Sequence, residues 1–368
     1  MKIKALEKVA ECWTSQGLLW AVTNGLEDYP VSVGRDLDVV VEKGRLRDAV
    51  QVVIDVLSPD GWVVLPNCQG WIWWVLAFKE RKDGRLESLQ IDLFEHLQWA
   101  FTWVVEGVGT DGALIRRGPF LEDPGGAVAK KFLLNGLSAG VKAFRNKPDY
   151  LNMPEPELAA LPAVLKRVSG SERLEILRAI EERNLVGLEA HLSDLRKACY
   201  WYALKNTGRY RRLKSALQKQ WVVNIAPQQG APVIEVWGAD QEQVRRLLTI
   251  LEAELSELVF HRIELIQGDK NTLSSRKLLR LSCLQVVLIF SNRLLPKSIS
   301  SDLTIRLEDG KKVLFFSRDR DRHSESLESS RVGIKNALLM IFKSKADLLI
   351  QTHNYLQPSK LATPKKLS

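Results

Sequence analysis

The sequence predicts an α+β domain over residues 1–108, a helical segment over 109–220 and an α/β domain over 221–350, followed by a flexible tail at 351–368. Three observations lead to this division. The chain of 368 residues is longer than one hydrophobic core usually serves. Its first hundred residues mix alternating strand patterns with helical ones, and its last third alternates strands with helices.

The first domain is predicted from hydrophobic spacing and from turn residues. Helical spacing with an apolar face indicates helices, and short alternating or apolar runs indicate strands. An Asp83-Gly84 pair between two apolar runs is a strong hairpin signal. The predicted helices are 4–16 and 45–57, and the predicted strands are 18–23, 36–41, 71–80 and 86–94.

The remaining elements follow from the same patterns. Helical spacing dominates the middle segment, where the predicted helices are 128–137, 155–168, 172–182 and 187–204. In the last domain the predicted strands are 233–237, 284–290 and 303–307, and the predicted helices are 241–258 and 332–343. The alternating order of these elements predicts an α/β domain.

The composition narrows the class of protein. The net charge of +9 favours anionic partners such as nucleotides, nucleic acid or an acidic surface. Cysteines 12, 68, 199 and 283 lie far apart, which argues against a zinc or redox motif and suits the reducing cytoplasm. The longest apolar run, 71–78, is too short for a transmembrane helix, and we expect a cytoplasmic protein.

Paired carboxylates are the strongest chemical signal in the chain. Asp36 and Asp38 are two residues apart, so on a strand they project from the same face. In a later strand Leu89, Ile91 and Leu93 alternate with polar residues, so Asp92 points away from the core face. Carboxylates on one face repel unless a cation lies between them, and Mg²⁺ prefers carboxylate and phosphate oxygens. A pattern of this kind on a strand edge also occurs without any metal.

A short turn precedes the carboxylates. Asn24-Gly25 follows an apolar strand, and a glycine there lets backbone amides approach a phosphate closely, although the pair alone is simply a turn. The order of turn, Asp36-Leu37-Asp38 and later Asp92 resembles the nucleotidyltransferase superfamily of the DNA polymerase beta type. The resemblance covers about residues 15–105. It implies an α+β nucleotidyltransferase-type fold, Asp36, Asp38 and Asp92 as catalytic metal ligands for Mg²⁺, and nucleotide binding by Asn24 and Gly25.

Basic residues lie beyond this domain. Lys130 and Lys131 fall where a helical segment of that superfamily often closes on the nucleotide, which implies a role in nucleotide binding; a solvated helix face is an equal alternative. A denser basic run could contact an anionic surface or a lipid-linked phosphate, or could be a solvated linker. That run consists of Arg209, Arg211, Arg212 and Lys214.

The C-terminal section resembles a thymidylate kinase-type domain. Residues 233–240 run from a strand into a helix, as the phosphate-binding segment of those kinases does. However, Gln243, Val244 and Arg245 stand where a phosphate loop needs glycine, lysine and a hydroxyl residue. The resemblance therefore implies a degenerate P-loop-kinase-like α/β domain without kinase activity, suited to scaffolding or acceptor binding.

These features together predict a magnesium-dependent nucleotidyltransferase. It would move a nucleoside monophosphate from a nucleoside triphosphate to an acceptor. The pairing of the two domains resembles proteins of cell-surface polysaccharide synthesis, which implies a saccharide or lipid-linked acceptor. One alternative is a non-catalytic nucleotide-binding or scaffolding protein with two decayed domains. Another is a nucleic-acid binder, which the net charge suggests but no recognisable motif supports.

Overall fold

The structure is a computed structural model in which most of the N-terminal two thirds of the chain is described. The described residues are 1–69, 72–99, 102–109, 112–131, 144, 152–206, 232–238, 240–258, 262–267, 285–291, 302–308, 311–316, 325–327 and 331–352. The predicted tail at 351–368 lies almost entirely outside them.

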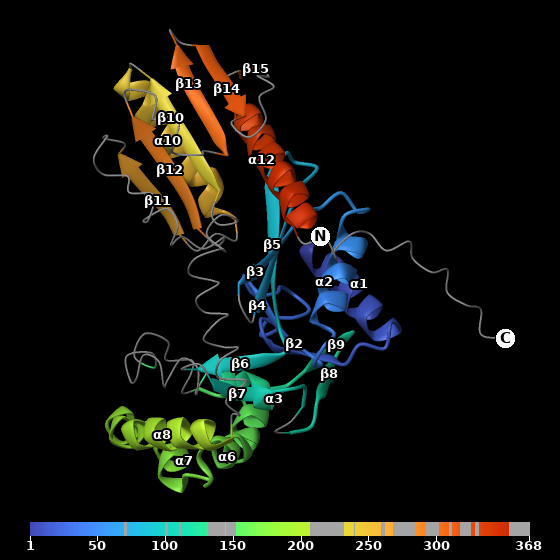
Figure 1. Cartoon of the computed structure of the whole chain (residues 1–368), viewed down its shortest axis with the longest axis vertical. Helices are drawn as coiled ribbons and strands as arrows, with labels where there is room; N and C mark the ends of the chain where they lie inside the picture. Colours follow the sequence, from blue (N-terminus) through green and yellow to red (C-terminus); the bar gives the residue numbers. More distant parts are fainter. Residues whose placement is uncertain are drawn as a thin grey trace, which may run out of the picture.

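A mixed seven-stranded sheet forms the centre of the N-terminal domain (Figure 1). The pairs β2–β5 and β1–β9 are parallel, and the remaining neighbours are antiparallel. This mixture supports the predicted α+β class. In spatial order the strands are β3 (Val63–Gln69), β4 (Ile72–Glu80), β5 (Leu86–Phe94), β2 (Leu37–Val41), β1 (Trp20–Asn24), β9 (Phe120–Glu122) and β8 (Ile115–Arg117).

Helices α1 (Lys2–Ser15) and α2 (Leu46–Leu57) share one hydrophobic core with this sheet. The helices pack as their apolar spacing predicts, with Trp13 and Val53 almost fully buried. The Trp13 indole donates a hydrogen bond of 3.0 Å to the Ala49 carbonyl and so joins the two helices. Strand positions such as Leu89, Ile91 and Leu93 point into this core, so the residues between them face the other way.

The predicted hairpin joins β4 and β5. Arg81 and Arg85 close the turn through a backbone hydrogen bond of 2.8 Å. Gly84 takes a φ of +74°, a left-handed conformation that glycine adopts without steric cost. The turn therefore sets the register that brings Asp92 opposite Trp74.

The boundary predicted at residue 108 differs from the boundary of the sheet. Strands β8 and β9 belong to the seven-stranded sheet, although both lie in the segment predicted to be helical. Sequence periodicity misses them because each is only three residues long. A two-stranded ribbon, β6 (His96–Trp99) with β7 (Thr102–Glu106), precedes them.

The helical segment follows the sheet. Helix α3 (Pro124–Val128) begins before the predicted helix at 128–137, and one π-type turn continues it over 129–131. Residues 132–137 lie outside the described part. The later helices α6 (Glu155–Ser169), α7 (Leu174–Glu181) and α8 (Leu185–Asn206) agree with prediction to within a few residues. They bury a core that includes sheet residues Val40 and Phe94.

The C-terminal domain contains a six-stranded sheet. Strands β11, β12, β10 and β13 run parallel, and β14 and β15 add an antiparallel edge. Parallel strands need crossover connections, which fits the predicted α/β class. The elements are β10 (Val233–Gly238), α10 (Gln241–Ser256), β11 (Arg262–Gln267), β12 (Gln285–Ser291), β13 (Leu303–Glu308), β14 (Lys311–Phe316), β15 (Glu325–Leu327) and α12 (Arg331–Thr352).

This C-terminal domain packs on the N-terminal sheet (Figure 1). Helix α12 lies along β3, and Phe342 stacks on Phe78 with 4.1 Å between ring centroids. Leu65, Leu76 and Phe78 share a hydrophobic core with α10 and α12. Phe78 and Leu76 project from the face of the sheet opposite the α1–α2 core. Helix α12 thus covers part of this face of the sheet, although it follows β4 by some 260 residues in sequence.

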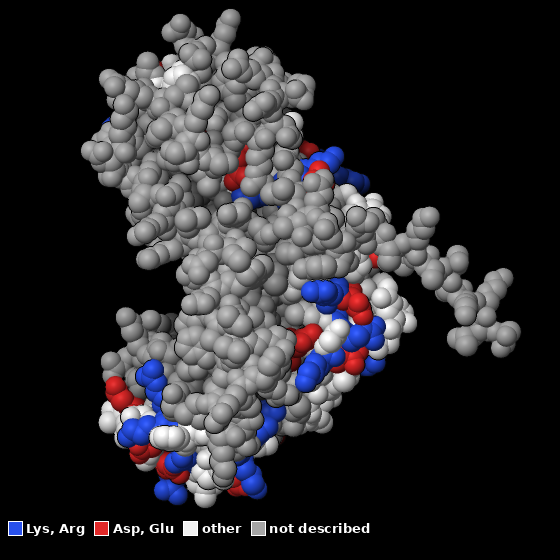
Figure 2. Space-filling view, viewed as in Figure 1, with Lys and Arg blue, Asp and Glu red and all other residues white. Residues whose placement is uncertain are grey.

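Where described residues show on the face drawn in Figure 2, Lys and Arg atoms lie among Asp and Glu atoms. Within the described residues no helix is long and apolar enough to cross a membrane.

Candidate functional site

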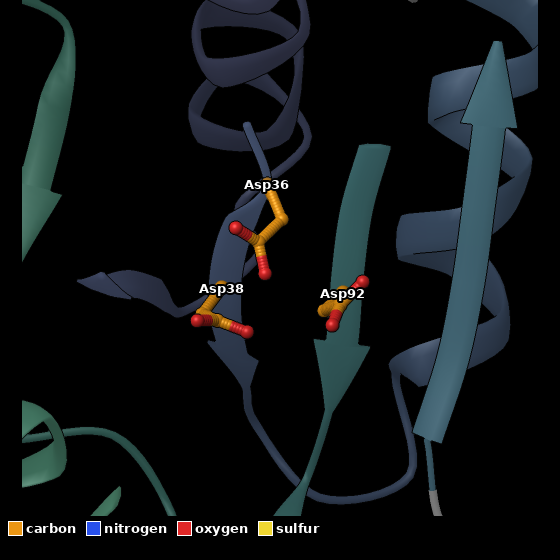
Figure 3. Close-up of side chains that lie close together, drawn as sticks. All are labelled: Asp36, Asp38 and Asp92. Atoms are coloured by element: carbon orange, nitrogen blue, oxygen red, sulfur yellow. The ribbon is translucent and has the colours of Figure 1, made fainter. Parts of the chain in front are cut away.

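The three predicted carboxylates converge. Asp38 on β2 and Asp92 on β5 are register partners on adjacent parallel strands, so their side chains leave the sheet side by side. Asp36 lies just before β2 and its side chain turns toward them (Figure 3). One oxygen from each carboxylate lies within 4.8 Å of the others. The three carboxylates that the resemblance groups together as metal ligands therefore lie together in the structure.

Burial differs among the three. Asp38 is fully buried and Asp92 is 6% exposed, whereas Asp36 is half-buried at the edge of the cluster. Their oxygen ligands, crowded at one point, form the kind of donor set that hard divalent cations such as Mg²⁺ take. The cluster could therefore hold a metal ion, and Asp36 marks its more open side.

Lys130 approaches the cluster from the π-type turn after α3. Its ammonium forms an ion pair with Asp38. Asn24, at the end of β1, is a second polar neighbour of the Asp38 carboxylate and, like Lys130, favours its ionised form. The sequence analysis left two roles open for Lys130, nucleotide binding or a solvated helix face. In this structure its side chain is mostly buried and neutralises one carboxylate of the cluster.

The electrostatics follow from burial and crowding. Burial, reinforced by the neighbouring Asp38, raises the pKa of Asp92 to about 8. Burial also raises the pKa of Asp38, although Lys130 opposes the shift. Burial acts to lower the Lys130 pKa, but the attraction of Asp38 is sufficient to raise it overall. The cluster therefore holds more negative charge than it can stabilise alone, which is the condition a bound cation relieves.

Gln90 is a neighbour that the sequence analysis did not single out. It lies on β5 two residues before Asp92, and its side-chain amide donates a hydrogen bond of 2.7 Å to Asp92 Oδ1. This bond orients the carboxylate and favours its ionised form. The period of two along a strand would have placed Gln90 beside Asp92.

Gly25 supports the cluster through its backbone. A Cβ there would lie 2.3 Å from the Asp36 carbonyl oxygen, and its φ of +102° disfavours other residues. Its N–H donates to Glu27 at 3.4 Å and its carbonyl accepts from Gly34 at 2.9 Å. Asn24 ends β1 opposite Asp38. The predicted nucleotide-binding turn thus adjoins the cluster, and Gly25 allows the Asp36 segment to pack closely.

The other basic residues that the sequence analysis singled out do not join the carboxylate cluster within the described residues. Lys131 forms an ion pair of 2.6 Å with Glu157 on α6, away from the three carboxylates. The run comprising Arg209, Arg211, Arg212 and Lys214 lies outside the described residues.

The cluster occupies a strip of the sheet between two hydrophobic patches. On the same face, Phe94 and Val40 pack against the helical segment, whereas Leu86 and Phe78 pack against the C-terminal domain. Arg35, next to Asp36 in sequence, donates a hydrogen bond of 3.3 Å to the Leu258 carbonyl of the C-terminal domain. Both neighbouring parts of the chain therefore border the carboxylates.

The start of helix α10 has no phosphate loop. Val244 is completely buried in the core, where a phosphate lysine would need to reach solvent. The Asp240 carboxylate caps the helix by accepting from Glu242 N at 2.9 Å and Gln243 N at 3.2 Å. These amides would otherwise attract phosphate, so the cap places negative charge where an anion would bind.

Comparison with known proteins gave no relatives. No protein-family model matches the chain, and no curated protein and no solved structure matches it either. The geometry of the carboxylates therefore carries the functional argument.

Proposed function

We propose that the protein is a magnesium-dependent nucleotidyltransferase whose site is formed by Asp36, Asp38 and Asp92. The observation that supports this most directly is the convergence of three carboxylates within 4.8 Å on one strip of the sheet. Such a donor set suits two divalent ions bound to a triphosphate, which supply Lewis-acid stabilisation of the reacting phosphate. The resemblance of the Asp36-Leu37-Asp38 segment to nucleotidyltransferases points the same way.

Each residue has a separate task in this proposal. Asp36 and Asp38 would hold the metal ion, which would supply charge stabilisation to the triphosphate, and an acceptor hydroxyl could then attack the α-phosphorus in line. Asp92, oriented by Gln90, accepts the proton of that hydroxyl or shares the metal. A new bond between the acceptor oxygen and phosphorus forms, the bond to the bridging oxygen breaks, and pyrophosphate leaves.

Lys130 would change partner during binding. In the absence of metal its ammonium is the cation that neutralises Asp38. If Asp38 held a divalent ion, Lys130 would lose this partner, and the negatively charged triphosphate would offer it another. The proposal therefore keeps the predicted contact between Lys130 and the nucleotide, in the state of the protein that has metal and triphosphate bound.

The test is binding followed by turnover. Mg²⁺ with a nucleoside triphosphate should raise the melting temperature of the parent, since ligands that bind the native state stabilise it. Asp38→Asn should remove this response, and Asp83→Asn, in the exposed hairpin turn, should retain it. Incubation of the parent with labelled triphosphates, Mg²⁺ and cell extract should then label an acceptor. A parent that shows no Mg²⁺-dependent nucleotide response would refute the proposal.

The Lys130–Asp38 ion pair also favours a second candidate, a non-catalytic nucleotide-binding or scaffolding protein. A fixed ammonium on a metal ligand could replace the metal permanently. In that case Mg²⁺ would leave the parent unaffected and would stabilise Lys130→Met, in which the carboxylates are left without their cation. The transferase proposal instead expects Mg²⁺ with a nucleoside triphosphate to stabilise the parent.

A further inference from the structure

Asp36 differs from the other two carboxylates of the cluster in how its backbone is held. Asp38 lies on β2 and Asp92 on β5, and the backbone hydrogen bonds between these parallel strands fix both residues. Asp36 comes before Leu37, the first residue of β2, and so lies outside the strand pairing. The place of Asp36 in the cluster therefore depends on the contacts of the short segment that contains it, residues 34–36.

The N-terminal domain holds the first half of this segment. The Gly34 N–H donates a hydrogen bond of 2.9 Å to the Gly25 carbonyl, and a Cβ on Gly34 would lie 3.1 Å from the Gly25 Cα. Lys2, the first residue of α1, donates from Nζ to the Gly34 carbonyl at 2.8 Å and to the Arg35 carbonyl at 3.4 Å. These contacts fix the backbone up to the residue before Asp36.

The C-terminal domain reaches the same segment through one side chain. The Arg35 guanidinium donates from Nη2 to the Leu258 carbonyl at 3.3 Å, across 223 residues of sequence. Leu258 follows helix α10 and is buried in the core that the C-terminal domain shares with the N-terminal sheet. Phe342 and Phe78 stack within that core. The carbonyl that Arg35 binds is therefore a fixed point of the docked C-terminal domain.

We propose that Arg35 is a positioning residue through which the docked C-terminal domain holds Asp36 in the carboxylate cluster. The inference rests on the proposed function for the role of the cluster as a metal site, whereas the connection between the domains exists without metal. It gives a task to a domain that has no phosphate loop. Docking fixes the residue next to Asp36, and the three carboxylates are then held together for a metal ion.

The charge of Arg35 makes the expected result specific in sign. A guanidinium next to a metal ligand repels a metal ion, so removal of the charge alone would strengthen metal binding. Removal of the bond to the Leu258 carbonyl should weaken metal binding, because Asp36 then also occupies positions away from the other two carboxylates. Arg35→Gln therefore weakens metal binding if Arg35 positions Asp36, and strengthens it if Arg35 acts only as a charge.

The first measurement is binding of Mn²⁺ alone by the full chain, followed by electron paramagnetic resonance of the free ion. Mn²⁺ takes the same oxygen ligands as Mg²⁺. Arg35→Gln should weaken binding about three- to tenfold, the range that the net value of one hydrogen bond implies. Phe342→Ala should weaken it by a similar factor, because it loosens docking at a ring contact outside the cluster. The matched controls, Arg81→Gln in the exposed hairpin and Met340→Ala at an exposed position of α12, should bind Mn²⁺ as the parent does.

The second measurement needs no metal. Amide hydrogen exchange over residues 31–37 should be faster in Arg35→Gln and in Phe342→Ala than in the parent, because the bond from the Gly34 N–H opens more often when the segment is less firmly held. The Asp123 N–H, which donates to the Val22 carbonyl at 2.8 Å, is the internal control and should exchange as in the parent.

The outcomes separate this inference from the proposed function. The double variant Arg35→Gln with Phe342→Ala should bind Mn²⁺ no more weakly than the weaker single variant, because both changes break one connection; losses that multiply would overturn the inference. Unchanged or stronger Mn²⁺ binding by Arg35→Gln would overturn it as well. If the parent binds no Mn²⁺, the metal site fails, and exchange over 31–37 alone decides whether the connection stands. If Phe342→Ala does not fold, Arg35→Gln remains decisive, since Arg35 is exposed and its replacement leaves the core intact.

Discussion

The crowding of Asp92 predicts a pH-dependent difference between the parent and Asp92→Asn. The pKa of Asp92 is raised from 3.8 to about 8, so its ionisation opposes folding. The contribution of Asp92 to stability is complete below pH 3.8 and is lost progressively as the pH rises toward about 8. Asparagine does not titrate, so this loss is absent from the variant.

The magnitude follows from the shift. Between pH 5 and 8 the free energy of unfolding of the parent should fall relative to Asp92→Asn by ~1.4 kcal/mol per pH unit. From pH 5 to pH 8 the difference therefore reaches about 4 kcal/mol. Mg²⁺ should recover part of it for the parent at pH 8, because a cation stabilises the ionised carboxylate, and should recover none for the variant.

Urea denaturation of both proteins at pH 5, 6, 7 and 8, with and without Mg²⁺, measures these differences. Asp83→Asn is the control, since Asp83 is exposed and the Arg85 backbone N–H lowers its pKa from 3.8, so Asp83 stays ionised between pH 5 and 8 and adds no trend there. Parallel pH curves for the parent and Asp92→Asn would show that the carboxylate is ordinary and would refute the reasoning about the cluster.

Three further changes test the surroundings of the site. Gly25→Ala forces a Cβ to within 2.3 Å of the Asp36 carbonyl at a φ of +102°, and we expect a loss of about 1–3 kcal/mol in urea denaturation together with a weaker Mg²⁺ response; unchanged stability would contradict the packing. Phe342→Ala removes the ring stacked on Phe78 and should destabilise the chain by about 3–5 kcal/mol, with a new early transition for the C-terminal domain in calorimetry; a single unshifted transition would argue against the docking. Asp240→Ala removes the cap of α10 and should lower the free energy of unfolding by about 0.5–2 kcal/mol without creating an ATP site. Micromolar ATP binding by full-length Asp240→Ala that persists after Asp38→Asn is added would contradict the absence of a phosphate loop.

The sequence by itself determined most of the local structure. Alternation along 86–94 identified β5 with its correct ends, and Asp83-Gly84 identified the turn before it. The same alternation placed Asp92 on the face away from the α1–α2 core. These inferences succeed because the period of a strand and the conformational preference of glycine act over a few neighbouring residues.

The sequence also identified what the C-terminal domain lacks. In the resemblance to thymidylate kinases Val244 falls at the position of the phosphate lysine, and its complete burial agrees with the expectation that a phosphate loop is absent. A missing residue type needs no tertiary information to be recognised. The contribution of Asp240, whose carboxylate caps the helix at that point, required the geometry of the turn.

Only the tertiary structure decided which strands are neighbours. Asp38 and Asp92 form one cluster because β2 pairs with β5 in parallel, and more than fifty residues separate the two aspartates in sequence. The ion pairs between Lys130 and Asp38 and between Lys131 and Glu157 likewise join segments that are distant along the chain. Strand order, burial and charge pairing depend on the packing of the entire chain, whereas a sequence pattern reports only the preferences of adjacent residues.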